Sequence, residues 1–158
     1  MELSVTQENF ARALSIVGRV ASNRTGLPIL GNILLRTDGT RLLVAATNLE
    51  IAATCYVGAK IVKQGDITLP ARLVSEYVSS LPKGTIELSS KGTSMTIASG
   101  NYSSIMTGVD ATEFPELPSI DEKQAVTYTI AEADFKQAIS QTIITTSNDT
   151  SRPVLTGV

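Results

Sequence analysis

Apolar and polar residues follow two different periods along this chain, which predict a mixture of helices and strands. Residues 7–20 and 70–80 each carry apolar side chains at helical spacing, so each predicts a helix with one apolar stripe. Thr6 stands where an N-cap would precede the first helix. The two predicted stripes consist of Phe10, Ala13, Leu14 and Val17, and of Leu73, Val74, Tyr77, Val78 and Leu81.

Short apolar or alternating runs bounded by turn residues predict strands in the rest of the first 110 residues. Asp38-Gly39 is a strong hairpin signal between two of them. The order is strand, helix, four strands, helix and three strands, which predicts an α+β fold with two helices packed on antiparallel β-sheets. The predicted strands cover residues 2–5, 29–36, 41–47, 49–61, 65–70, 85–90, 94–99 and 102–108.

The opening of the chain repeats itself after 125 positions without a gap. Phe10 then falls on Phe135, and Leu30 falls on Leu155. A period of this length suits a whole domain. We therefore predict a first complete domain over residues 1–122, and a linker with the truncated start of a second domain over 123–158.

In this second stretch, residues 126–130 predict a strand and residues 132–144 a helix. The segment from Ser147 to Val158 reads as the beginning of another strand. A lone strand and helix cannot bury their apolar sides, so we expect the chain to be a piece of a longer protein or its tail to find a partner. The apolar side of this helix would consist of Phe135, Ala138, Ile139 and Ile143.

Composition limits the chemistry that this chain can perform. The sequence has no histidine and one cysteine, Cys55, which excludes a Ser-His-Asp or Cys-His nucleophile, an internal disulfide and, in practice, a zinc site. It contains no glycine-rich phosphate loop, so we expect no cofactor. The net charge is −2, so any DNA contact requires local clustering of positive charge. No apolar run reaches about 18 residues and no signal peptide opens the chain, so we expect no membrane contact and a cytoplasmic location.

An acidic group near residue 115 is the one candidate for metal chemistry. Carboxylates can hold Mg²⁺, which would make the protein a metal-dependent enzyme. Carboxylates in loops are more often solvated, and the surrounding proline-rich segment reads as a connector. We therefore expect neither a catalytic residue nor a metal ligand among Glu113, Glu116, Asp121 and Glu122.

Four segments occur in an order that resembles the first domain of the bacterial sliding clamps, the β subunits of the replicative DNA polymerase. They read "LPILGNILLR", "ATNLEI", "ITLPARLVSEYVSSLP" and "EFPELP", and "SRPVLTGV" is similar to the opening of the second domain. The resemblance implies three similar domains per chain and a head-to-tail homodimer that closes as a ring around double-stranded DNA. It implies a non-catalytic accessory subunit that tethers the DNA polymerase catalytic subunit, a nucleotidyltransferase, and meets the clamp loader.

This resemblance predicts a fragment that cannot close a ring alone. The alternative is a stand-alone clamp-like module that pairs its open edge with another protein.

Arginines on the two helices are the candidate DNA-binding residues. Arg12 and Arg19 are seven positions apart, so they lie about 20° from each other around the first helix, away from its apolar stripe. The resemblance implies that this face lines the hole of the ring. It adds Arg24, on the loop after the helix, and Arg72, at the start of the second helix. The simpler reading is that these arginines are solvated surface residues.

The resemblance also implies a peptide pocket and a ring interface. Arg152 and Leu155 match pocket residues that the second domain carries, but the other walls lie beyond Val158, so we expect no strong peptide binding. Asp149 departs from the neutral polar residue common in the family, and would weaken a DNA contact there.

For the ring interface, the strand near residues 101–107 and the second helix form the edge that meets the partner chain. Ser104 stands where a bulky aromatic side chain is common, which would weaken this contact. Met106 and Val74 are the apolar residues expected at this edge.

Overall fold

The computed structural model describes residues 1–21, 26–118, 125–149 and 151–158. It divides into two compact units, Met1–Pro118 and Ser119–Val158, which are described separately. Among the sequence-predicted site residues, Arg24, Asp121 and Glu122 lie outside the described residues. None of the described helices is long and apolar enough to cross a membrane.

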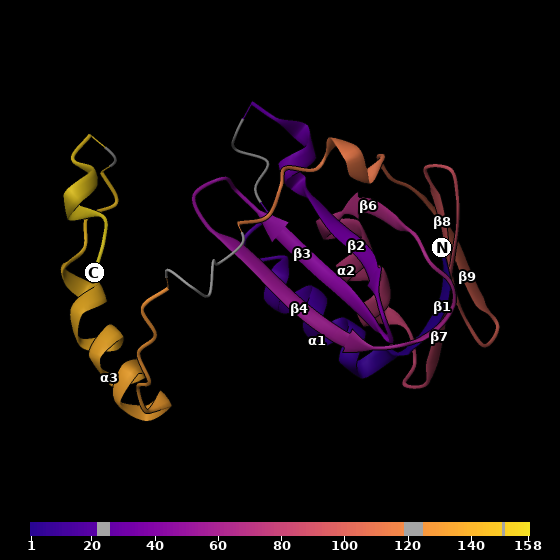
Figure 1. Ribbon diagram of the computed structural model, residues 1–158, viewed down its shortest axis with the longest axis horizontal. Helices are drawn as coiled ribbons and strands as arrows, with labels where there is room; N and C mark the ends of the chain where they lie inside the picture. The colour runs from indigo at the N-terminus through magenta and orange to yellow at the C-terminus, as the bar shows by residue number, and fades with distance from the viewer. Residues whose placement is uncertain (22–25, 119–124, 150) are drawn as a thin grey trace. The chain divides into compact units, whose positions relative to one another are not determined.

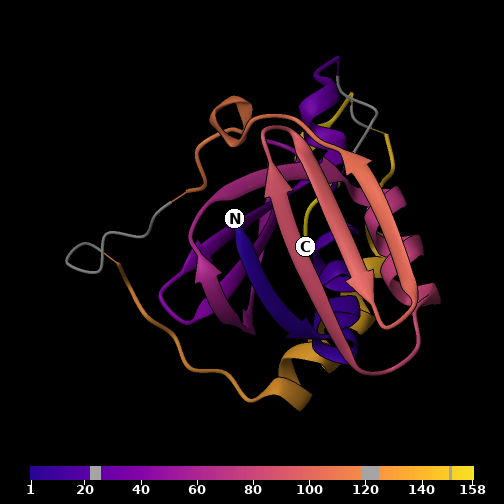
Figure 2. The ribbon, with the colours of Figure 1, turned by 90° about the vertical axis from the view of Figure 1, so that its right-hand side faces the viewer.

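Two antiparallel sheets and two helices form the first unit, in agreement with the predicted fold class (Figures 1 and 2). The helices are α1 (Gln7–Val17) and α2 (Ala71–Ser80). The five-stranded sheet has the order β5 (Lys60–Lys63), β1 (Glu2–Thr6), β7 (Thr85–Lys91), β8 (Ser94–Ser99) and β9 (Tyr102–Thr107). The four-stranded sheet has the order β4 (Ala52–Gly58), β3 (Arg41–Thr47), β2 (Asn32–Asp38) and β6 (Asp66–Pro70).

One hydrophobic core joins the helices to both sheets. Every residue of the predicted α1 stripe is buried, because the helical period places these residues on the side that faces the strands. Strands contribute every second residue, such as Ile86 and Leu88 from β7 and Met95 and Ile97 from β8. The α2 stripe is narrower than predicted, since Val74 and Val78 are buried while Leu73 is about half exposed.

A smaller apolar cluster covers the other face of the four-stranded sheet. Leu34 and Ala45 pack there against Ala111 and Phe114, which belong to the segment after β9 and its short 3-10 helix η2 (Ala111–Glu113). Arg36 lies on this same face, because it alternates with the core residue Leu35 along β2. The four-stranded sheet therefore has helices on one face and a short covering segment on the other.

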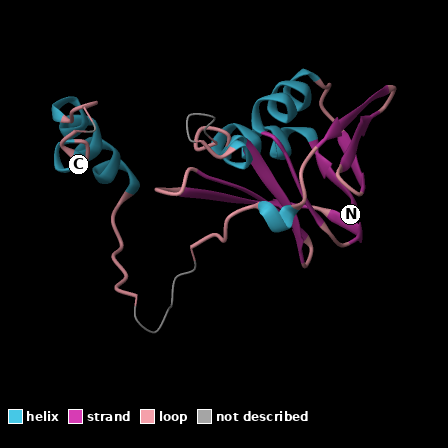
Figure 3. Ribbon diagram, turned by 90° about the horizontal axis from the view of Figure 1, so that it is seen from above, coloured by secondary structure: helices cyan, strands magenta, loops and turns pink. Residues whose placement is uncertain are grey.

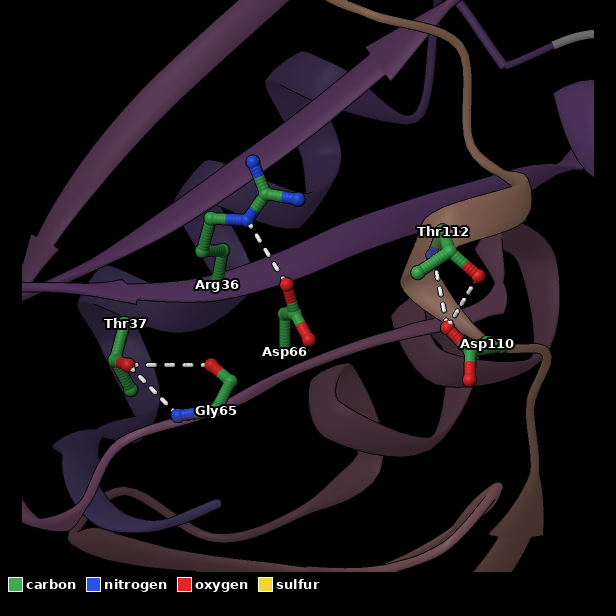
Figure 4. Close-up of polar contacts among 6 residues, drawn as sticks. All are labelled: Arg36, Thr37, Gly65, Asp66, Asp110 and Thr112. Atoms are coloured by element: carbon green, nitrogen blue, oxygen red, sulfur yellow. Dashed lines mark hydrogen bonds and ion pairs between the residues drawn. The ribbon is translucent and has the colours of Figure 1, made fainter.

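Hydrogen bonds attach the covering segment to β6 at its beginning. Thr68 and Val109 exchange two backbone hydrogen bonds of 3.1 Å, and the Thr68 hydroxyl donates a further bond to the Val109 carbonyl. Within the segment, Asp110 accepts hydrogen bonds from the backbone N–H and the hydroxyl of Thr112 (Figure 4), and these bonds hold the pKa of its carboxyl below the usual range. Arg36 and Asp66 form an ion pair of 3.1 Å across β2 and β6 nearby.

Four details of the first unit differ from the predictions. The helix predicted over 7–20 ends at Val17, so Arg19 lies in the turn that follows it. The predicted strand over 29–36 begins as a 3-10 helix, η1 (Pro28–Gly31), and becomes a strand only at Asn32. The predicted strand over 49–61 is divided into β4 and β5, which belong to different sheets, because the chain crosses between the sheets at Ala59. Thr6 occupies the N-cap position of α1, but its side chain makes no capping hydrogen bond.

The second unit contains the predicted helix without the predicted strands. Helix α3 (Glu132–Thr142) is followed by the short 3-10 helices η3 (Ile143–Thr145) and η4 (Pro153–Leu155). The predicted strand over 126–130 is exposed chain without strand pairing, and the described residues of the segment predicted to start a strand at Ser147, which are 147–149 and 151–158, form no strand either. The apolar side predicted for α3 is not buried either: Phe135 and Ile143 are about half exposed. A strand needs a neighbour to accept its hydrogen bonds, and the described part of this unit provides none.

Gly108 allows the covering segment to approach the sheet. A Cβ atom at this position would lie 1.9 Å from the Thr68 carbonyl oxygen, which belongs to the rigid backbone of β6. Gly108→Ala should therefore separate Thr68 from Val109 and lower the free energy of unfolding by about 2–3 kcal/mol. Chemical denaturation followed by circular dichroism measures this loss.

Gly58→Ala is the matched control, since an added Cβ at Gly58 meets no atom within 4 Å. We expect this variant to change the free energy of unfolding by less than about 1 kcal/mol. Equal losses in the two variants would show that the close approach at Gly108 is not important for stability.

Candidate nucleic-acid interface

Helices α1 and α2 lie side by side on the same side of the sheets (Figure 3). They run in opposite directions, because the beginning of α1 contacts the end of α2: the Gln7 side-chain amide donates a buried hydrogen bond of 3.0 Å to the Val78 carbonyl. The backbone N–H of Gln7 donates a second bond, of 2.8 Å, to the Gly84 carbonyl. This alignment determines which side chains meet on the outward side of the helix pair.

Four basic side chains, two on the helices and two just beyond their ends, lie along the outward side of the helix pair, and we call this surface the helix face. Arg12 and Arg19 are exposed, as the sequence predicts, and neither forms an ion pair with any described residue. Arg72, at the start of α2, and Lys83, just beyond its end, complete the set. The helix face therefore concentrates positive charge in a chain whose net charge is −2.

Two of these four cations are paired with carboxylates. Arg72 donates through Nε to Glu76, 2.7 Å away and one helical turn further along α2. Lys83 lies 2.6 Å from Glu8, in the first turn of α1. Hydrogen bonding to each carboxylate, together with its negative charge, raises the pKa of the Arg72 guanidinium and of the Lys83 ammonium.

Arg19 and Arg72 both line a shallow hollow between the helices. It has a volume of about 520 Å³ and is lined by the end of α1 and the beginning of α2, with Ser75 and Glu76 among its residues. Backbone and hydroxyl groups add polar character there. Such an arrangement suits contact with an anionic backbone, and it offers no aromatic platform for stacking bases.

The described residues contain no cluster of side chains placed to bind a metal ion. No group of three or more His, Cys, Asp or Glu side chains in the described part of the chain is placed to hold a metal ion. Glu113 and Glu116, the described members of the acidic group, are exposed. The helix face is thus the best-formed candidate site.

The predicted pocket residues belong to the second unit. Arg152 and Leu155 are exposed; Arg152 directly precedes η4 and Leu155 is its last residue, and the Leu155 N–H donates to the Arg152 carbonyl at 2.9 Å. Asp149 accepts a hydrogen bond from the Ser151 backbone N–H, which lowers the pKa of its carboxyl, so this side chain is ionised at neutral pH.

Two of the residues predicted at the ring edge are core residues instead. Val74 is 0% exposed and Met106 is 3% exposed, so neither side chain is available to a partner. Ser104 is partly buried and lies on the same side of β9 as Met106. The exposed apolar side chains of this region are Leu73, Tyr102 and Ile105, the last being 72% exposed. Neighbouring residues of a strand point to opposite sides, so the alternation along β9 could have identified Ile105, not Met106, as an exposed apolar residue.

Comparison with known proteins points to one family. The family model described as "DNA polymerase III beta subunit, N-terminal domain" matches residues 1–118. The beta sliding clamp of Synechococcus elongatus is 34% identical over 163 residues, and that of Bacillus subtilis is 30% identical over 167 residues. Both alignments cover 100% of this chain but only 42% and 44% of the relatives, so the chain spans less than half of their length.

Solved structures give the same result. The crystal structure of the DNA polymerase sliding clamp from Bacillus subtilis superposes with a TM-score of 0.93 at 28% identity, covering 100% of this chain and 43% of that one. The structure of Caulobacter crescentus pol III beta gives a TM-score of 0.91 at 28% identity, covering 99% and 42%.

The hydrogen bond from Gln7 to Val78 can be tested as the contact that aligns the two helices. Gln7→Ala removes a buried donor, and we expect the free energy of unfolding to fall by about 1–2 kcal/mol. Asn9→Ala, an exposed change on the same helix, should alter it by less than about 0.5 kcal/mol. Equal midpoints for Gln7→Ala and the unchanged protein in urea denaturation would refute this role.

Proposed function

This chain belongs to the family of DNA polymerase III beta subunits, and from that membership we propose that it forms part of a sliding clamp. Residues 1–122 would be the first clamp domain, and residues 123–158 the linker and the start of the second domain. The complete protein would be a head-to-tail homodimer that encircles duplex DNA and keeps the polymerase on its template. It would do this as a non-catalytic accessory subunit, in the cytoplasm.

The observation that best supports this proposal is the placement of the basic residues on the helix face. A clamp holds DNA by enclosure, so its contacts need to recognise only the phosphates that every sequence shares. Arg12 on α1 and Arg72 on α2 project from two aligned helices, and Arg19 lies in the turn just beyond the end of α1. Arg24, in the loop after α1, would extend this set.

The proposed partners are the DNA polymerase catalytic subunit and the clamp loader. Arg152 and Leu155 would contribute to the pocket that receives their peptides, and both side chains are exposed.

The proposed ring interface would use β9, an edge strand of the five-stranded sheet. Its unpaired backbone groups can accept a strand from the partner chain. Val74 and Met106 are buried in the core. The apolar contact would instead come from the exposed side chains of Leu73, Tyr102 and Ile105. Ser104 would add little to this contact.

DNA binding by the helix face can be measured with a short duplex of arbitrary sequence. Replacing both Arg12 and Arg19 by Ala removes two phosphate contacts, so the slope of log K against log salt concentration should become shallower by about 2. Fluorescence anisotropy between about 50 and 200 mM salt measures this change.

Arg36→Ala is the control, because it removes a positive charge from the opposite face of the four-stranded sheet. Its salt slope should match that of the unchanged protein. If Arg36→Ala reduced binding as much as the loss of an arginine from the helix face, the proposed interface would be wrong.

Enclosure predicts a dependence on DNA topology. The full-length protein, once loaded on a circular duplex, should remain bound during gel filtration and be lost when one cut linearises the circle. This loss follows because a ring without strong adhesion slides off a free end. Equal retention on the circle and on linear DNA with open ends would contradict the proposed clamp.

A further inference from the structure

We propose that Glu76, assisted by Glu8, limits how tightly the helix face holds DNA by competing with phosphate for Arg72 and Lys83. The inference rests on the proposed function and assigns these carboxylates a role in it. The ion pairs would make the phosphate contacts of Arg72 and Lys83 weak enough to be exchanged rapidly while the ring moves along the duplex.

The Arg72–Glu76 pair contributes little to the stability of the fold. The Arg72 side chain is 89% exposed and the Glu76 side chain 62% exposed, and exposed ion pairs of this spacing stabilise a helix only slightly. Glu76 lies in the second half of α2, away from the helix N-terminus where a carboxylate would be favoured. Its clearest physical effect is thus on the charge that Arg72 presents.

Glu8 has a similar position at the other end of the helix pair. Its carboxylate lies 2.6 Å from Lys83, and both side chains are mostly exposed. Because α1 and α2 run in opposite directions, the Arg72–Glu76 pair and the Lys83–Glu8 pair stand at opposite ends of the helix face. Glu8 also stabilises α1, because a carboxylate in the first turn interacts favourably with the helix dipole. Replacing Glu8 would therefore change both folding and charge, so Glu76 is the better residue to test.

These two pairs change how the helix face responds to a phosphate. Arg12 and Arg19 form no ion pair with the described residues, so they meet a phosphate with their full charge. A phosphate near Arg72 or Lys83 must share the cation with a carboxylate less than 3 Å away, and is repelled by that carboxylate. The number of counterions released on binding is therefore smaller than the number of basic side chains.

Glu76→Gln tests this inference with minimal change of shape. The amide keeps the length of the side chain and its helix propensity while removing the negative charge. We expect the chain to bind a short duplex about 3-fold more tightly at about 50 mM salt, with a steeper salt slope. The thermal unfolding midpoint should stay within about 2 °C of the unchanged value.

A second variant shows whether the effect passes through Arg72. In an Arg72→Ala background, Glu76→Gln should give a clearly smaller gain, because the guanidinium that it releases is absent. An undiminished gain in that background would overturn the competition with phosphate. Asp66→Asn is the control for overall charge, since Asp66 is paired with Arg36 on the face of the sheet opposite the helices.

The outcomes separate this inference from the proposed function. If Glu76→Gln leaves affinity unchanged while loss of Arg12 and Arg19 weakens it, the inference fails and the DNA interface stands. If loss of those arginines has no effect, the interface itself is wrong. If Asp66→Asn tightens binding as much as Glu76→Gln, the effect reflects net charge alone and the inference is overturned.

Discussion

Burial of one side of each helix against the two sheets is the constraint on which the rest of the first unit depends. On α1, the side chains of Phe10, Leu14 and Val17 are almost completely buried. On α2, Val74 and Val78 are buried in the same way. A helix can bury only one stripe at a time, so the opposite stripe must face outward. The antiparallel alignment, supported by the Gln7–Val78 hydrogen bond, then brings Arg19 and Arg72 to the same hollow. The helix face is thus a geometric consequence of the core.

The spacing of apolar residues predicted most of the helices and strands, because apolar residues recur on the side of an element that is buried. The spacing could not predict the division of residues 49–61, since the crossing between sheets at Ala59 depends on which neighbours are available and leaves no mark in the alternation. The same limit explains residues 126–130, which alternate like a strand but have no strand beside them among the described residues. A period indicates what a segment can form, and neighbours decide whether it does.

The candidate site was predictable where exposure follows from helical geometry alone. Arg12 is exposed because it lies opposite the buried stripe of α1, whereas Arg19 is exposed in the turn after Val17, where the helix predicted over 7–20 has already ended. Val74 and Met106, predicted at the ring edge, are buried, because apolar residues near an edge can equally point into the core. The Arg72–Glu76 pair was visible as an i, i+4 spacing, but spacing alone does not show that the two groups meet.

Stability and the proposed DNA contact depend on opposite sides of the helix pair, and this separation matters for how the protein can change. A substitution in the buried stripe alters packing and costs several kcal/mol for a large side chain, whatever it does to DNA. A charge change on the exposed helix face has little effect on folding. If the helix face binds DNA as proposed, its affinity can therefore be adjusted by exchanging Arg, Lys, Glu and Gln there without loss of the fold. The proposed clamp would need this freedom, because its arginines would have to contact the duplex without stopping it from moving.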